Sequence, residues 1–109
     1  MNQAILYLIY NKELSAIKIG VGDITGRRYK VHKNRGWTII KYWYFSNKKD
    51  AHAVEAAVLK EIRKRTKSNH YLNKEHMPDG GYTETFDATK ITKRKVINLI
   101  NKTFKAMAK

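Results

Sequence analysis

The chain has 109 residues, of which 23 are lysine or arginine and nine are aspartate or glutamate, giving a formal net charge of +14. This length suits a single core, and a hydrophobic content of 42% argues against wholesale disorder. The absence of cysteine excludes disulfides, thiolate zinc sites and thiol nucleophiles. The apolar run at 4–10 is too short to cross a bilayer and no secretion signal opens the chain. We therefore expect a soluble cytoplasmic protein with no membrane partner.

The opening of the chain predicts a β-hairpin followed by a helix. Residues 4–10 are rich in β-forming side chains, and residues 16–21 alternate in polarity. These two segments are expected to pair across the polar break at 11–15. Asp23 or Thr25 then caps a helix that ends near position 34.

A third strand and a long helix are expected next. Nearly every residue from 37 to 45 is β-branched or aromatic, which favours a strand. Ser46 or Asn47 is expected to cap a helix over about 48–65. An irregular segment at 68–81 follows.

The end of the chain predicts a short strand at 82–86 and a final helix opened by Asp87 or Thr89. The order β-β-α-β-α, then loop, strand and helix, is typical of an α+β fold. We expect a small central antiparallel or mixed β-sheet flanked by helices, with an added C-terminal helix. The main domain would span 1–86, and a basic helix at 87–109 would pack on it or extend it.

Positive charge is unevenly distributed along the chain. Residues 88–109 contain seven basic residues and no acid, and 60–67 form a second dense run. Because +14 exceeds what solubility requires of a small domain, nucleic acid is the expected partner, although solvated faces are the simpler alternative. The basic residues that we expect to contact nucleic acid are Arg27, Lys30, Lys33, Arg35, Lys60, Arg63, Lys64, Lys93 and Arg94.

Glu55 is expected on the apolar face of the long helix. Ala51, Val54, Val58 and Ile62 share one face at helical spacing, and Glu55 points into the same stripe. A carboxylate facing a core is costly unless it is paired or binds a cation. The pattern allows a structural interpretation, in which Glu55 pairs with an arginine or reaches the edge of the core, and a functional one, in which it binds a metal or acts in catalysis.

Arg28 is expected on the inner face of the first helix, because it lies between the apolar residues Ile24 and Val31. His32 follows Arg28 by one turn. The structural interpretation pairs Arg28 with Glu55. The functional interpretation makes Arg28 a cationic clamp for a phosphate, beside an imidazole that can move a proton.

These positions match the motifs of a known family, and the chain resembles the GIY-YIG nuclease superfamily, especially its short phage-type branch. Residues 5–7, Ile-Leu-Tyr, are similar to the first motif, and residues 18–20, Lys-Ile-Gly, to the second. The family's arginine follows the second motif by eight residues, which is Arg28, and His32 fills the next motif position. Glu55 matches the family's metal-binding glutamate on the following long helix.

The resemblance covers about residues 4–73 and has two departures. The glycine of the first motif is Ile5, and the tyrosine of the second is Lys18. The family's late asparagine has Asn69 as its nearest match here, with Asn73 as the second candidate.

The resemblance implies a divalent-metal-dependent endonuclease that hydrolyses DNA phosphodiester bonds with low sequence specificity by itself. Glu55 would hold Mg²⁺ or Mn²⁺, and Arg28 would neutralise charge on the phosphoryl oxygens. Tyr7, with Lys18 or His32, would orient and deprotonate the attacking water. Asn69 would support the site. RNA stays open as a substrate, and a homodimer or a partner protein would supply specificity.

Two other functions stay open at this point. Lys18 in place of tyrosine favours a catalytically inactive GIY-YIG-like module that only binds nucleic acid. A basic adaptor or inhibitor that targets an acidic protein surface is the other. The small size and lysine richness suggest a phage-encoded protein acting in a bacterial host.

Several residues have plainer interpretations. Tyr7, taken without the family match, is an ordinary core tyrosine. Trp37, Trp43 and Tyr44 are expected in the core, although strand aromatics can also stack on bases. Glu84 is expected to be a solvated strand residue, with a role in the active site as the second interpretation.

Overall fold

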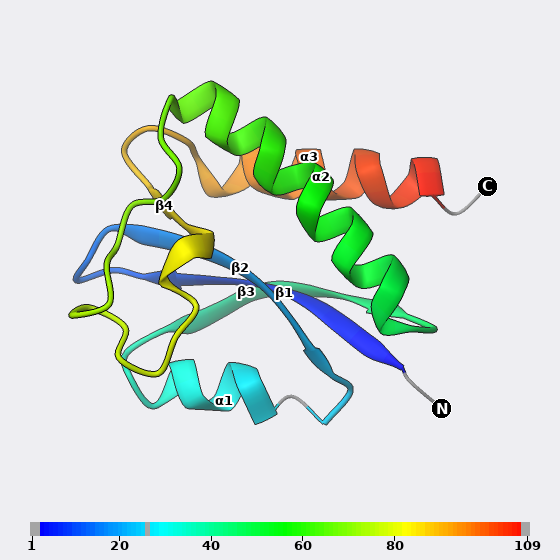
Figure 1. Cartoon of the computed structure of the whole chain (residues 1–109), viewed down its shortest axis with the longest axis horizontal. Helices are drawn as coiled ribbons and strands as arrows, with labels where there is room; N and C mark the ends of the chain where they lie inside the picture. Colours follow the sequence, from blue (N-terminus) through cyan, green and yellow to red (C-terminus); the bar gives the residue numbers. More distant parts are fainter. Residues whose placement is uncertain (1–2, 26, 108–109) are drawn as a thin grey trace.

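The structure is a computed structural model that describes residues 3–25 and 27–107. Within these residues one antiparallel sheet forms in the order β3-β1-β2-β4. Its strands are β1 (Ala4–Asn11), β2 (Ala16–Asp23), β3 (Thr38–Phe45) and β4 (Thr85–Asp87). The helices are α1 (Arg27–Lys33), α2 (Lys48–Thr66), the 3₁₀ turn η1 (Tyr82–Glu84) and α3 (Lys93–Met107). The expected α+β class is confirmed, with a central sheet, flanking helices and a C-terminal helix (Figure 1).

Strand β1 is central and has both faces buried, so its side chains divide between two cores. Leu6 and Leu8 pack with α2 and α3 on one face. Ile5, Tyr7 and Ile9 point to the opposite face, where α1 and the 68–81 segment lie. Figure 1 shows this layering, with α1 on one side of the sheet and α2 with α3 on the other.

Helix α2 follows its predicted pattern closely. The side chain of Asn47 accepts a hydrogen bond from the Asp50 amide at 2.8 Å, so the predicted cap is confirmed. The predicted apolar stripe is buried along its whole length. Its members are Ala51, Val54, Val58 and Ile62. Glu55 is therefore held beside the core by packing that the helical period dictates.

Helix α1 differs from its prediction. Ile24 and Val31 were expected to mark its inner face, but they are 50% and 44% exposed. His32 is buried instead, with its ring centroid 6.3 Å from that of Tyr7 and 6.4 Å from that of Trp37. The helix has only seven residues and begins after Ile24, so the aromatic contacts of His32 decide which face is buried. The side chain of Arg28 lies outside the described part of the structure.

The C-terminal elements begin later than predicted. Residues 82–84 form a 3₁₀ turn, and the short strand is β4. Thr92, rather than the predicted Asp87 or Thr89, caps α3 by accepting from the Lys95 amide at 3.1 Å. The side chain of Asp87 instead closes a turn with Thr89.

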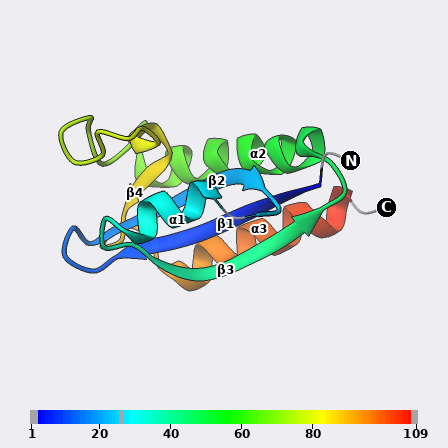
Figure 2. The ribbon, with the colours of Figure 1, turned by 90° about the horizontal axis from the view of Figure 1, so that it is seen from below.

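Helix α3 packs along α2 over the sheet (Figures 1 and 2). Val96 and Ile100 are fully buried between them, and the indole of Trp43 donates to Asn101 at 2.8 Å. The basic C-terminal helix thus contributes directly to the main hydrophobic core. Among the described residues, no helix is both long and apolar enough to span a bilayer.

Candidate active site

A pocket of about 510 Å³ opens along the outer edge of β2. In the described chain β4 pairs only with residues 16–18 of β2, so the edge of β2 beyond them faces the pocket. Strand β2, the start of α1, helix α2 and η1 all contribute side chains. The residues lining the pocket are Lys18, Gly20, Val21, Gly22, Asp23, Arg27, Lys48, His52, Glu55 and Glu84.

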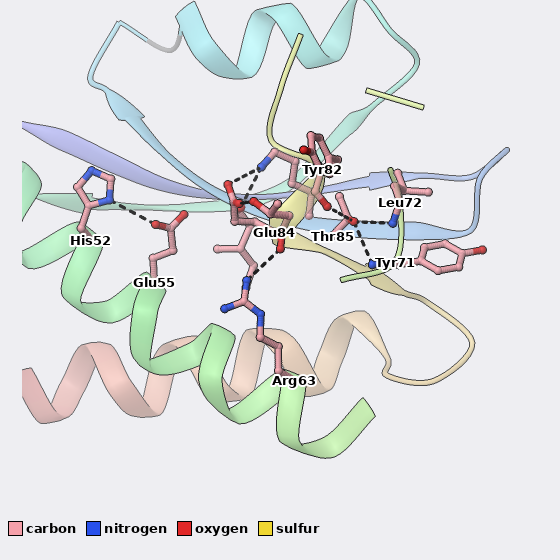
Figure 3. A network of polar contacts seen from close by, with 11 residues as sticks. His52, Glu55, Arg63, Tyr71, Leu72, Tyr82, Glu84 and Thr85 are labelled. Carbon is pink, nitrogen blue, oxygen red and sulfur yellow. Dashed lines mark hydrogen bonds and ion pairs between the residues drawn. The ribbon is translucent and has the colours of Figure 1, made fainter. Parts of the chain in front are cut away.

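Glu55 enters this pocket from α2 with a largely buried side chain, 15% exposed. Burial raises the pKa of its carboxyl above the ordinary value of 4.5, and the nearby charge of Glu84 raises it further. The Nδ1 atom of His52, one helical turn away, lies 3.3 Å from Oε1 of Glu55 (Figure 3). The carboxylate is thus desolvated yet still opens onto the pocket, as a metal ligand or a catalytic acid requires.

Lys18 faces the same pocket from β2 and is almost fully buried, at 1% exposure. Its Nζ donates to the Ile19 carbonyl at 3.2 Å and lies 3.7 Å from the Glu84 carboxylate. Glu84 is therefore part of the pocket, and the expectation of a solvated strand residue was wrong. Lys18 thus ties this carboxylate to strand β2.

The approach of η1 to Lys18 depends on Gly81. This residue adopts φ +88°, a region that disfavours side chains, and a Cβ there would lie 2.9 Å from the Lys18 Nζ. In the sequence, the Gly80–Gly81 pair is the feature that marks the place where the chain passes Lys18 and carries Glu84 to the pocket. The local sequence does not show that Gly81 lies against Lys18, so the role of this glycine pair could not be predicted.

Two side chains, those of Arg63 and Thr85, hold η1 in place (Figure 3). Arg63 of α2 donates through Nε to the Asn69 carbonyl at 2.8 Å and through Nη2 to the Thr83 carbonyl at 3.0 Å. The Thr85 hydroxyl donates to the Tyr82 carbonyl at 2.6 Å and accepts from the Leu72 amide at 2.9 Å. The guanidinium of Arg63, predicted to contact nucleic acid, thus ties α2 to the turn that carries Glu84.

Tyr7 and His32 lie behind the pocket and do not line it. Tyr7 is fully buried, and its ring packs against the backbone of Gly20, which does line the pocket. His32 is 3% exposed and lies beside Tyr7 and beneath Gly81. The predicted phenol and imidazole are therefore adjacent to the candidate site but separated from solvent.

The predicted asparagines do not reach the pocket. Asn69 is exposed, and its backbone carbonyl serves Arg63. The side chain of Asn73 accepts from the Glu75 amide at 3.1 Å and closes a local turn. Neither asparagine contributes to the pocket wall in this structure.

The predicted nucleic-acid contacts are spread over several faces. Arg27 lines the pocket, is 81% exposed and lies 3.4 Å from Asp23. Arg35 forms an ion pair with Asp79 at 2.9 Å, and the Lys93 Nζ lies 4.0 Å from the centre of the Tyr10 ring. The remaining ones are exposed and carry positive charge on α1, α2 and α3. They are Lys30, Lys33, Lys60, Lys64 and Arg94.

The described residues contain no cluster of three acidic, histidine or cysteine side chains with metal-binding geometry. Mg²⁺, however, is commonly held by one or two carboxylates, with water and substrate phosphate oxygens completing its shell. Glu55 and Glu84 line one open pocket and supply such a donor set. The residues present therefore fit the Mg²⁺ or Mn²⁺ that the family resemblance implies.

No family model, curated protein or solved structure matches this chain. The resemblance to GIY-YIG nucleases rests on the motif residues described above.

Proposed function

We propose that the protein is a divalent-metal-dependent endonuclease that hydrolyses phosphodiester bonds in DNA. One observation carries the proposal. The desolvated carboxylate of Glu55 opens onto a pocket whose wall also holds the basic side chains Lys18, Arg27 and Lys48 and the acids Asp23 and Glu84. A partly buried acid with a raised pKa, in an open pocket that holds a second carboxylate and several basic side chains, is typical of a site that binds a metal ion together with a phosphate.

Each residue has a proposed role. Glu55 would hold Mg²⁺ or Mn²⁺, which when bound would stabilise the charge on the leaving oxygen. Arg27 and Lys48 would bind the phosphoryl oxygens, and Lys18 would hold Glu84 in the pocket wall. The resemblance assigns the same task to Arg28.

The proton acceptor that the structure favours is His52. Its side chain is 59% exposed at the pocket, whereas Tyr7 and His32, which the family match suggested, are buried. With Nδ1 directed to Glu55, the other ring nitrogen of His52 can take a proton from the attacking water. The new oxygen–phosphorus bond forms as the bond to the leaving sugar oxygen breaks. In this proposal Tyr7 supports Gly20 and the pocket floor.

The test is nicking of supercoiled plasmid by the whole protein with Mg²⁺, Mn²⁺ or EDTA. Glu55→Gln should lower the nicking rate by roughly a hundredfold or more, since it removes the charge that holds the metal. Glu61→Gln is the matched control, because Glu61 lies on the same helix but pairs with Arg65 on the surface. Absence of metal-dependent nicking by the wild type, with DNA binding intact, would overturn the endonuclease proposal.

The second candidate is a nucleic-acid-binding module without cleavage. The observation that favours it is the Lys18–Glu84 ion pair at the position where the family has tyrosine. Such a module would bind DNA with a steep salt dependence and show no nicking under any metal condition. A protein adaptor would instead show DNA binding that is weak at all salt concentrations.

A further inference from the structure

Two tyrosines project from the edge strand β3 into solvent. Tyr42 is 45% exposed and Tyr44 is 60% exposed, and their ring centroids lie 5.3 Å apart in an edge-to-face arrangement. Both lie on the α1 side of the sheet, because they pair with Tyr7 and Ile5 of β1. The expectation of a core position is confirmed for Trp37 and Trp43 but wrong for Tyr44.

The tyrosines are exposed because α1 covers only part of this sheet face. Figure 2 shows α1 over one end of the sheet, while the C-terminal half of β3 extends beyond it. A shallow groove of about 170 Å³ lies between the two elements. Its other lining residues include Ile5, Ile24, Tyr29 and Lys30. An aromatic wall, an apolar floor and a lysine at the rim thus meet on an open surface.

We propose that this groove, the tyrosine groove, binds an unpaired base of single-stranded nucleic acid by stacking on Tyr42 and Tyr44. Aromatic rings accept any base, since every base has a π face, and a lysine beside them pairs with the backbone phosphate. The exposed side chains of Tyr44 and Ile24 give the groove an apolar surface that is open to solvent, as is typical of a binding site.

Charge favours nucleic acid over a second copy of the chain as the occupant. Two molecules of net charge +14 repel one another, whereas a polyanion is attracted. The neighbouring hydroxyl of Tyr42 raises the pKa of Tyr44, so the Tyr44 phenol carries no negative charge that would repel phosphate at neutral pH.

The tyrosine groove also adjoins the pocket. Asp23 and Arg27 line the pocket, while Ile24 and Thr25, between them in the chain, line the groove. A single strand that spans both sites would therefore place a phosphate in the pocket and another of its nucleotides at the tyrosines. The inference rests on the nucleic-acid binding of the proposed function but not on cleavage.

The first experiment measures binding by fluorescence anisotropy in EDTA. We expect labelled oligothymidine to bind about five- to a hundredfold more tightly than an abasic oligonucleotide of the same length and charge. Tyr42→Ala and Tyr44→Ala should remove most of this preference, and the corresponding phenylalanine variants should keep it. Tyr71→Ala is the matched control, because Tyr71 is 41% exposed on a segment outside the groove.

The second experiment uses the wild type alone and so does not depend on the folding of variants. Irradiation of a complex with 5-iodouracil oligonucleotide should cross-link the base to Tyr42 or Tyr44, as located by mass spectrometry. Equal affinity for oligothymidine and the abasic strand, or cross-links only outside the groove, would overturn the proposal. A dimer in sedimentation velocity that Tyr44→Ala abolishes would also overturn it, in favour of a second copy.

The outcomes separate this inference from the endonuclease proposal. Base preference without plasmid nicking leaves the tyrosine groove intact and removes cleavage. Nicking without base preference removes the groove and leaves cleavage. Failure to bind any nucleic acid overturns both.

Discussion

The phenol ring of Tyr7 lies directly against the backbone of Gly20, its pairing partner across the β1–β2 hairpin. A side chain at position 20 would overlap the ring, so the strand needs glycine here for space. Gly20 lines the pocket on one side and covers the buried aromatic cluster on the other. This contact links the packing of the α1-side core to the shape of the candidate site.

Gly20→Ala tests this contact. We expect the free energy of unfolding to fall by about 1–3 kcal/mol, because the methyl group forces the Tyr7 ring or the hairpin to move. In the Gly20→Ala, Tyr7→Ala double variant the clash is gone, so the combined loss should be smaller than the sum of the two single losses. Urea denaturation of the four proteins measures this coupling, and strictly additive losses would contradict the overlap.

Glu55 should make the free energy of unfolding of the metal-free protein depend on pH. Burial raises the pKa of Glu55 above 4.5, so the folded protein keeps this proton to a higher pH than the unfolded chain does. The contribution of Glu55 to the free energy of unfolding therefore falls as the pH rises from about 4.5 through the folded pKa.

Glu55→Gln should accordingly gain stability relative to the wild type across this interval and keep a constant gain above it. Chemical denaturation in EDTA at a series of pH values measures the difference. Glu61→Gln, on the exposed side of the same helix, should show no such trend. Parallel curves for the wild type and Glu55→Gln would mean that the folded protein does not desolvate this carboxyl.

Glu84→Gln should have opposite effects on stability and on DNA affinity. Lys18 is buried and loses an ion-pair partner, so we expect a loss of about 1–3 kcal/mol in the free energy of unfolding. The pocket also loses a negative charge, so metal-free DNA binding should strengthen a few-fold and remain salt-dependent. Thermal denaturation and anisotropy measure the two effects. Weaker DNA binding would show that Glu84 supports the ligand site and does not oppose it.

Arg63 and Lys64 are adjacent basic residues with different expected roles. Arg63→Ala removes hydrogen bonds to the Asn69 and Thr83 carbonyls and should lower the free energy of unfolding by about 1–3 kcal/mol. Lys64 is exposed, so Lys64→Ala should leave stability unchanged and reduce the slope of log affinity against log salt by about one if it contacts a phosphate. Denaturation and salt titration distinguish the two, and identical behaviour would contradict the assignment.

Local patterns were sufficient for the elements whose neighbours in space are also near in sequence. The hairpin followed from β-forming runs around a polar break, and the buried face of α2 from its 3.6-residue period. That same period placed Glu55 beside the core, because a long helix with a continuous apolar stripe has one way to pack. A short helix lacks that constraint, so the tertiary contacts of His32, and not the spacing of Ile24 and Val31, determined the orientation of α1.

The sequence by itself determined the α+β class, the hairpin and the acid on α2, since each depends on contacts between close neighbours in the chain. Only the tertiary structure decided that Glu84 meets Lys18, that Arg63 braces this turn and that Tyr44 faces solvent. These outcomes depend on how a long irregular segment returns to the β2 edge and on how little of the sheet α1 covers. Both are set by packing between distant parts of the chain, which no local pattern encodes.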